Sequence, residues 1–194
     1  MANATIPKLD KPGAGLPFYE WAVANYILVP LRLNTTSIQK ALAEVDSERA
    51  QIEALVSALS VTQLNEQRLI PRLIGLEDSS RFWSVAMALE HIVIVNSRAL
   101  QLVKALTNGV TPAGKTSTAD VKPGEVDAAT IVSKFLSNSK EYVDVAASLN
   151  LDAHPNVTYQ HPWFGKMNAK QWVLFAAPHM GIHRKQIAEI IHRL

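Results

Sequence analysis

The sequence has 194 residues, of which 48% are hydrophobic and 19% charged, a composition typical of a folded globular chain that excludes a disordered or fibrous one. Its 19 basic and 17 acidic side chains leave a formal net charge of +2, and the cations are scattered along the chain, which argues against nucleic acid as a partner. The sequence contains no cysteine, so disulfides, thiolate catalysis and cysteine-type zinc sites are excluded, and any metal would need His, Asp or Glu ligands.

Residues 1–35 are predicted to be an arm and a short helix outside the core domain. Prolines and glycines mark residues 1–15 as extended. The apolar run 18–31 is predicted to be a helix that Pro30 stops or kinks, because proline lacks the N–H donor that a helix interior needs. This run contains Glu20 and Asn25, is too short and too polar to span a bilayer, and does not resemble a secretory signal. We therefore expect a cytoplasmic protein with no membrane partner.

Four further segments show helical periodicity, and almost none shows the alternation typical of a half-buried strand. The predicted helices are 36–59, a second one capped by Asp78 or Ser79 and ending at Asn108 and Gly109, 125–149, and a last one that Asn168 and Gln171 open as a capping box. The connection 110–124 is expected to be the longest exposed loop and the most mobile segment. The sequence thus predicts one all-α domain over residues 36–194, a four-helix bundle.

Two histidines of the last predicted helix form a candidate metal-binding pair. His179 and His183 are four residues apart and therefore lie on successive turns of one face. That face is otherwise mostly apolar, whereas Arg184 and Lys185 project the other way. The pair has the geometry of helical zinc ligands, but no glutamate lies between them, so the HExxH protease mechanism is not supported. For the pair alone, an interpretation as two hydrogen-bonded core histidines stays open.

A third inward-facing histidine strengthens the metal hypothesis. His91 lies in the second predicted helix, in line with Ala88 and Val95 at the border of the apolar face. Three buried imidazoles without a metal would each need hydrogen-bond partners, whereas one divalent ion satisfies all three. Three histidine ligands with an open fourth position are typical of catalytic zinc sites. We predict that His91, His179 and His183 hold one divalent ion, and neutral imidazole suits nickel and zinc alike.

Two residues of the same helix bear on this site. Gln186 lies one turn beyond His183, where it would hold a ligand ring or a metal-bound water by a hydrogen bond, or be a satisfied interior amide. Pro178 is predicted to bend the helix, and either aims His179 at the metal or simply marks where the regular helix begins.

An aromatic group surrounds the start of the last helix. Its members are Tyr159, His161, Trp163 and Phe164 in the preceding connection and Trp172 in the helix itself. These side chains would either wall a pocket above the ion or plug the end of the bundle.

The segment 82–99, which contains Leu89-Glu90-His91, and the ending His161-Pro162-Trp163-Phe164-Gly165, Gln171-Trp172 and His179-x-x-x-His183-x-x-Gln186 resemble the DinB-like superfamily of metal-binding four-helix bundles. The resemblance covers roughly residues 36–194. It implies an up-down-down-up bundle in which one histidine of the second helix and two of the fourth hold nickel or zinc, here His91, His179 and His183. It also implies that the chain forms homodimers, as members often do.

The resemblance implies more about a metal site than about a reaction. Characterised relatives are thiol-dependent transferases and isomerases that use low-molecular-weight thiols, and others are described as metal-dependent hydrolases. The first hypothesis is therefore a metal-dependent enzyme, a thiol-dependent transferase or a hydrolase, in which the ion lowers the pKa of a bound water or thiol and presents it to a small-molecule substrate. The alternative is a non-catalytic bundle protein that a metal stabilises or that binds a small ligand.

Overall fold

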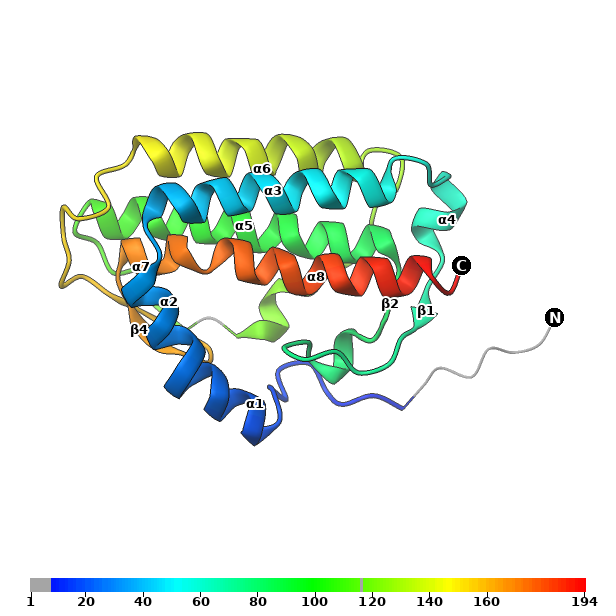
Figure 1. The fold of residues 1–194 in the computed structure, drawn as a ribbon, viewed down its shortest axis with the longest axis horizontal. Helices are drawn as coiled ribbons and strands as arrows, with labels where there is room; N and C mark the ends of the chain where they lie inside the picture. Colours follow the sequence, from blue (N-terminus) through cyan, green and yellow to red (C-terminus); the bar gives the residue numbers. More distant parts are fainter. Residues whose placement is uncertain (1–7, 116) are drawn as a thin grey trace.

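The structure is a computed structural model and describes residues 8–115 and 117–194. Its main body is a bundle of four long helices, α3 (Ile38–Val56), α5 (Val85–Thr107), α6 (Ile131–Ser148) and α8 (Ala176–Ile191). The helices α3 and α8 run in one direction and α5 and α6 in the other (Figure 1). Since α5 packs against α6 and α8, and α3 against α8 and α6, the parallel helices are neighbours. The predicted up-down-down-up bundle is confirmed.

Hydroxyl and amide side chains set where the helices begin. Ser37 accepts a hydrogen bond from Lys40 N at the start of α3. The Ser84 side chain accepts a hydrogen bond from Met87 N at the start of α5. The prediction that Asp78 or Ser79 caps this helix is therefore wrong. Those two residues belong instead to a short 3-10 helix, η2 (Asp78–Ser80). The predicted end of α5 at Asn108 is confirmed, and α6 begins six residues later than predicted.

The N-terminal helix, defined here as residues 18–35, continues through Pro30 instead of stopping there. It consists of α1 (Phe18–Val23), a π-helical turn η1 (Ala24–Leu28) and α2 (Val29–Thr35). Pro30 occupies the first turn of α2, where its missing N–H is no loss because the wider π turn precedes it. Of the two predicted effects of Pro30, the stop is therefore wrong, and the helix ends at Thr35 instead of Leu31. The predicted arm falls partly outside the described residues, in 1–7.

The last predicted helix is divided in two. Asn168 and Gln171 form the predicted capping box at the start of α7 (Ala169–Leu174), and Phe175 separates this helix from α8. Pro178 has no N–H to offer the carbonyl of Leu174 four residues earlier. Arg32 Nε donates to that carbonyl at 2.9 Å in its place, so a side chain of α2 stabilises the break.

The connections contain more structure than their composition indicates. They hold two antiparallel pairs of short strands, β1 (Arg68–Leu69) with β2 (Phe82–Trp83) and β3 (Tyr159–His161) with β4 (Gly165–Met167). They also hold α4 (Val61–Asn65) and a 3-10 helix, η3 (Thr118–Val121). The segment 108–130 joins the parallel helices α5 and α6 and therefore returns along the length of the bundle.

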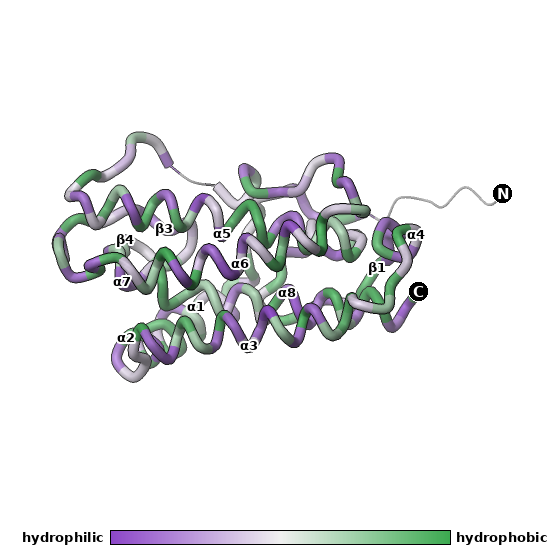
Figure 2. The backbone as a smooth tube through the Cα atoms, turned by 90° about the horizontal axis from the view of Figure 1, so that it is seen from above, coloured by the Kyte–Doolittle hydropathy of each residue, from purple (hydrophilic) through white to green (hydrophobic). Residues whose placement is uncertain are grey.

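The hydrophobic core lies between the four long helices. Hydrophobic and hydrophilic residues alternate along each of them (Figure 2). The largest fully buried side chains include Leu89 and Ile92 of α5, Phe135 of α6 and Ile187 of α8. Among the described residues, no helix combines the length and apolar character needed to cross a membrane.

Candidate metal centre

Three histidines meet between α5 and α8. His91 comes from the second turn of α5, and His179 and His183 come from successive turns of α8. One ring nitrogen of each lies within 4.8 Å of the others, and the Nε2 atoms of His91 and His179 are 3.1 Å apart. The structure thus brings together the three residues that the helical spacing turned inward.

Hydrogen bonds fix the tautomers of two of the three rings. His91 Nδ1 lies 2.8 Å from the carbonyl oxygen of Val121, which can only accept, so this nitrogen carries the proton. His183 Nδ1 lies 2.6 Å from Gln186 Oε1, while Gln186 Nε2 donates to Ser80 O at 2.8 Å. Both rings therefore keep their proton on Nδ1 and leave the Nε2 lone pair free.

Burial keeps all three imidazoles neutral. It lowers the pKa of His91 to about 4 and, together with the nearby His91, that of His183 to about 3. The pKa of His179 falls well below its usual value, first through burial and then through His183 and His91. His179 Nδ1 is buried, with no hydrogen-bond partner among the described residues. Three unprotonated rings at neutral pH are the form in which imidazole binds metals.

The donor set fits a divalent ion. Nitrogen ligands roughly 2.0–2.1 Å from a tetrahedral ion are about 3.3 Å apart, close to the His91–His179 separation. The unprotonated His91 Nε2 faces the His179 Nε2 atom, an arrangement that is repulsive unless a proton or a cation lies between the two nitrogens. Neutral nitrogen donors of this kind suit zinc and nickel.

Two residues beside the histidines were not predicted from the sequence. The Trp83 ring stacks on His183 at an interplanar angle of 9° and lies 5.3 Å from the ring of His91. Lys122 Nζ lies 5.4 Å from the centre of the Trp83 ring and donates to Ser79 Oγ at 2.6 Å. Lys122 follows Val121, but a lysine in a loop rich in threonine, proline and glycine carries no signal that it folds over the three histidines.

Of the residues predicted around the site, Gln186 contacts a histidine directly, through the bond to His183 described above. His161 instead accepts hydrogen bonds at Nδ1 from the backbone N–H groups of Trp163 and Phe164. Its ring packs 5.0 Å from Trp172. Burial lowers the pKa of His161 to about 4.

The other aromatic residues predicted around the site contact the N-terminal helix or line a cavity. The carbonyl of Trp163 accepts a hydrogen bond from Trp21 in the N-terminal helix. Tyr159 is buried and lies 6.4 Å from the Trp172 ring. Tyr159 and Trp172 share the lining of a cavity of about 300 Å³ with Val95, one turn beyond His91, and with Val121. Of these residues, Tyr159 and Trp172 thus line a cavity, whereas Trp163 contacts the N-terminal helix.

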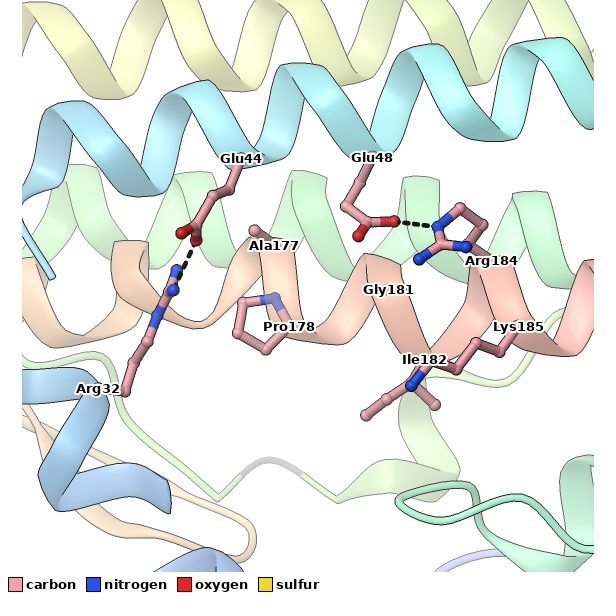
Figure 3. Close-up of a pocket in the computed structure, with 9 residues that line it drawn as sticks. All are labelled: Arg32, Glu44, Glu48, Ala177, Pro178, Gly181, Ile182, Arg184 and Lys185. Carbon is pink, nitrogen blue, oxygen red and sulfur yellow. Dashed lines mark hydrogen bonds and ion pairs between the residues drawn. The ribbon is translucent and has the colours of Figure 1, made fainter. Parts of the chain in front are cut away.

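A second hollow lies on the outer face of α8, away from the histidine rings. It measures about 330 Å³ and runs between α2, α3 and α8. Figure 3 shows its two ion pairs, Arg32 with Glu44 and Arg184 with Glu48. A Cβ at Gly181 would lie 3.2 Å from Glu48 Oε1, so glycine there lets Glu48 approach α8.

The fold and the site together define a four-helix bundle with a three-histidine cluster. A sequence profile of the DinB superfamily matches residues 44–187, most of the bundle. The chain belongs to the DinB superfamily.

The fold is also found in a solved structure, that of YfiT from Bacillus subtilis, described as "a probable metal-dependent hydrolase with an unusual four-helix bundle topology". The two chains superpose with a TM-score of 0.56 over 82% of this chain and 90% of YfiT. Their sequences are 15% identical, so the likeness shows the fold alone. The comparison with curated proteins gave no match.

Proposed function

We propose that this chain is a metal-dependent enzyme in which His91, His179 and His183 hold one divalent ion, zinc or nickel, and that its substrate is a small molecule. The observation that carries the proposal is the pair of fixed tautomers, because His91 and His183 both keep Nε2 unprotonated while one ring nitrogen of each of the three histidines lies within 4.8 Å of the others. A divalent ion bound there would supply Lewis-acid chemistry and lower the pKa of a water or thiol that it binds. Hydrolysis and transfer of a low-molecular-weight thiol are the two reactions that fit, and the description of YfiT favours hydrolysis.

Lys122 would hold an anionic group of the substrate beside the histidines. Its ammonium group is half-buried against Trp83 and forms no ion pair with any described carboxylate. Burial lowers the pKa of Lys122, while the nearby Glu77 opposes that shift. A cation that is partly withdrawn from water attracts an anion more strongly than an exposed one.

The apolar part of the substrate would occupy the cavity of about 300 Å³ whose mainly apolar lining includes Val95, Val121, Tyr159 and Trp172. Val121 belongs to this lining and also accepts the hydrogen bond of His91. A molecule in the cavity would therefore lie next to the ring that the ion binds. Cavities with mostly apolar walls and a few polar groups are typical of sites that bind small molecules.

Metal analysis of purified protein tests the metal centre. We expect one equivalent of zinc or nickel after reconstitution, lost in His91→Ala and in His183→Ala but kept in His192→Ala, which changes an exposed histidine at the end of α8. Helical circular dichroism should stay near the wild-type level in all three variants, because the substitutions leave the apolar residues of the bundle core unchanged. Wild-type protein without stoichiometric metal, or His91→Ala that binds as tightly as the wild type, would defeat the proposal.

A substrate panel separates an enzyme from a metal-stabilised scaffold. Ester, amide and thiol-transfer substrates with an anionic group should show turnover that a chelator abolishes and that returns with the metal. Lys122→Met should raise KM for anionic substrates by about tenfold and leave neutral ones unchanged. If the metal raises the melting temperature but no substrate turns over, the non-catalytic alternative replaces the enzyme.

A further inference from the structure

The N-terminal helix exposes an apolar face. Its outward side carries Phe18, Tyr19, Tyr26, Ile27, Leu28 and Leu31, all of them more than half exposed. Phe18 is 79% exposed and Tyr26 73%, values ordinary for a lysine and unusual for aromatic side chains. The helix projects from one end of the bundle (Figure 1), and the exposed fractions show that no other part of the described chain covers these side chains.

Three side chains with polar groups on the opposite side of this helix are bonded to the bundle. Glu20 is buried, pairs with Arg72 and accepts from Gly75 N at 3.0 Å. Trp21 Nε1 donates to Trp163 O at 3.1 Å, and Arg32 Nε donates to Leu174 O at 2.9 Å. These bonds fix the rotation of the helix about its axis. The exposure of the apolar side is therefore imposed by specific contacts, and the helix has the reverse of the usual amphipathic arrangement.

The area of this face is that of one side of a stable protein interface. Six large side chains at these exposures present roughly 700 Å² of mostly apolar surface, whereas a standard interface buries about 800 Å² per partner. Patches above a few hundred Å² on a monomer mark interaction sites. The superfamily profile begins at residue 44, so the helix is an addition to the matched bundle.

The charge of the face suits a second copy of the same chain. Between Phe18 and Leu31 the only charged residue is Glu20, which is buried and paired, so no like charges would meet at a two-fold axis. An antiparallel pairing would place the aromatic end of one helix on the aliphatic end of the other, Phe18 and Tyr19 against Leu28 and Leu31. Helices that lie on membranes carry Lys or Arg along their polar side, and here the polar side faces the bundle.

We propose that two copies of the chain form a two-fold symmetric dimer in which their N-terminal helices pack antiparallel through these apolar faces. The helix of 18 residues is about 27 Å long, enough for such a pairing. Tyr26 lies near the middle of the helix and so close to the two-fold axis. The dimer does not depend on the metal centre, and its failure would leave the proposed function untouched.

Light scattering on the full chain across a range of concentrations tests the dimer. We expect wild-type protein at twice the chain mass of 21.3 kDa. Tyr26→Asp should raise the dissociation constant by roughly 30-fold or more, because it places two carboxylates together in an apolar interface. Leu31→Asp should act in the same direction. Val110→Asp, at an exposed apolar residue outside the helix, should leave the dimer unchanged.

An experiment with opposite charges at residue 26 shows whether the apolar faces of two copies contact each other. Tyr26→Asp and Tyr26→Lys chains should each be monomeric alone and should form a mixed dimer when combined. Monomeric wild-type protein at about 100 µM, or a dimer that Tyr26→Asp and Leu31→Asp leave intact, would overturn the proposal. Monomeric wild-type protein that sediments with phosphatidylcholine and phosphatidylglycerol vesicles, with Tyr26→Asp staying in solution, would assign the face to a membrane surface instead.

Discussion

Gln186 links the histidine cluster to the wall of the bundle through two hydrogen bonds. Its Oε1 accepts from His183 Nδ1 and its Nε2 donates to Ser80 O. Because the bond to His183 selects the ring tautomer, its loss should weaken metal binding without unfolding the chain. We expect Gln186→Met, of similar size, to raise the metal dissociation constant by about 10–100-fold. Gln51→Met, at an exposed residue of α3, is the control. A chelator-competition titration that finds equal affinities would refute this role.

His161 should make stability depend on pH. Its folded pKa of about 4 lies below the unfolded value of 6.5, so the unfolded chain binds more protons between these values. The free energy of unfolding should therefore hold above pH 6.5 and fall as the pH drops toward 4. The loss at pH 5 should be about 1–2 kcal/mol, allowing for partial solvent screening. Urea unfolding at pH 7 and pH 5 measures it.

The variant His161→Asn isolates this contribution. Its side-chain oxygen still accepts from the backbone N–H groups but does not titrate in this range. In this variant the difference in the free energy of unfolding between pH 7 and pH 5 should be smaller than in the wild type by about 1–2 kcal/mol. An NMR titration that places the His161 pKa near 6.5 in the folded protein would rule out the effect.

The sequence predicts the three clustered histidines but not the groups that orient their rings. Helical spacing turns His91, His179 and His183 inward, and this follows from residue types on regular helices. The acceptors Val121 O and Ser80 O are backbone carbonyls, which every residue has, so no residue type marks them. Only the path of the loops places these carbonyls at the site.

At the scale of elements, the break between α7 and α8 depends on a residue far away in the sequence. Arg32 donates to the Leu174 carbonyl that Pro178 leaves without its helical partner. Arg32→Met should lower the free energy of unfolding by about 1–3 kcal/mol, because it removes a charged hydrogen bond and the pair with Glu44. In the Pro178→Ala background the new N–H at residue 178 can reach Leu174, so the same change should cost less.

A double-mutant cycle by urea unfolding measures this dependence. We expect a coupling energy of about 1 kcal/mol between residues 32 and 178. Arg98→Met, at an exposed arginine of α5 without an ion pair among the described carboxylates, should change stability by less than about 0.5 kcal/mol in either background. Additive effects of Arg32→Met and Pro178→Ala would mean that Arg32 acts only through Glu44.

Prediction of the elements succeeded where periodicity and caps are local. The capping box at Asn168 and the end of α5 at Asn108 were read correctly from adjacent residues. The start of α5 was predicted wrongly, because Asp78, Ser79 and Ser84 are all residue types that cap helices well. The chain pairs as strand β2 up to Trp83, so the helix begins only after Ser84. The N-terminal helix passes Pro30 because a π turn absorbs the proline, an adjustment without a sequence signature.

At the scale of the molecule, the order of the bundle follows from one long connection. The parallel neighbours α5 and α6 require the segment 108–130 to return along the whole bundle, and its 3-10 helix η3 then lies over the histidines. Composition identified this segment as an exposed loop, whereas its packing over the site is a property of the topology. The up-down-down-up order itself came from the family resemblance, since helix periodicity alone does not fix directions.

Glu77 joins this connection to the N-terminal arm. The buried carboxylate accepts from Gly13 N at 3.4 Å, Gly15 N at 3.2 Å and Thr118 Oγ1 at 2.8 Å. It therefore joins the arm, the turn η3 and the entry to α5 beside the site. Since none of these segments belongs to the four-helix core, breaking the junction should free them and leave the bundle intact.

Hydrogen exchange of Glu77→Ala tests this separation. The amides of Gly13 and Gly15 should exchange about 10–100-fold faster, because each loses a hydrogen bond to a charged acceptor worth about 1.5–3 kcal/mol. Amides in α3 and α8 should keep wild-type protection. Glu53→Ala, at a surface residue of α3, should leave both sets unchanged. Unaltered exchange at both glycines would show that Glu77 does not hold the arm, and lost protection in α3 and α8 would show that it holds the bundle.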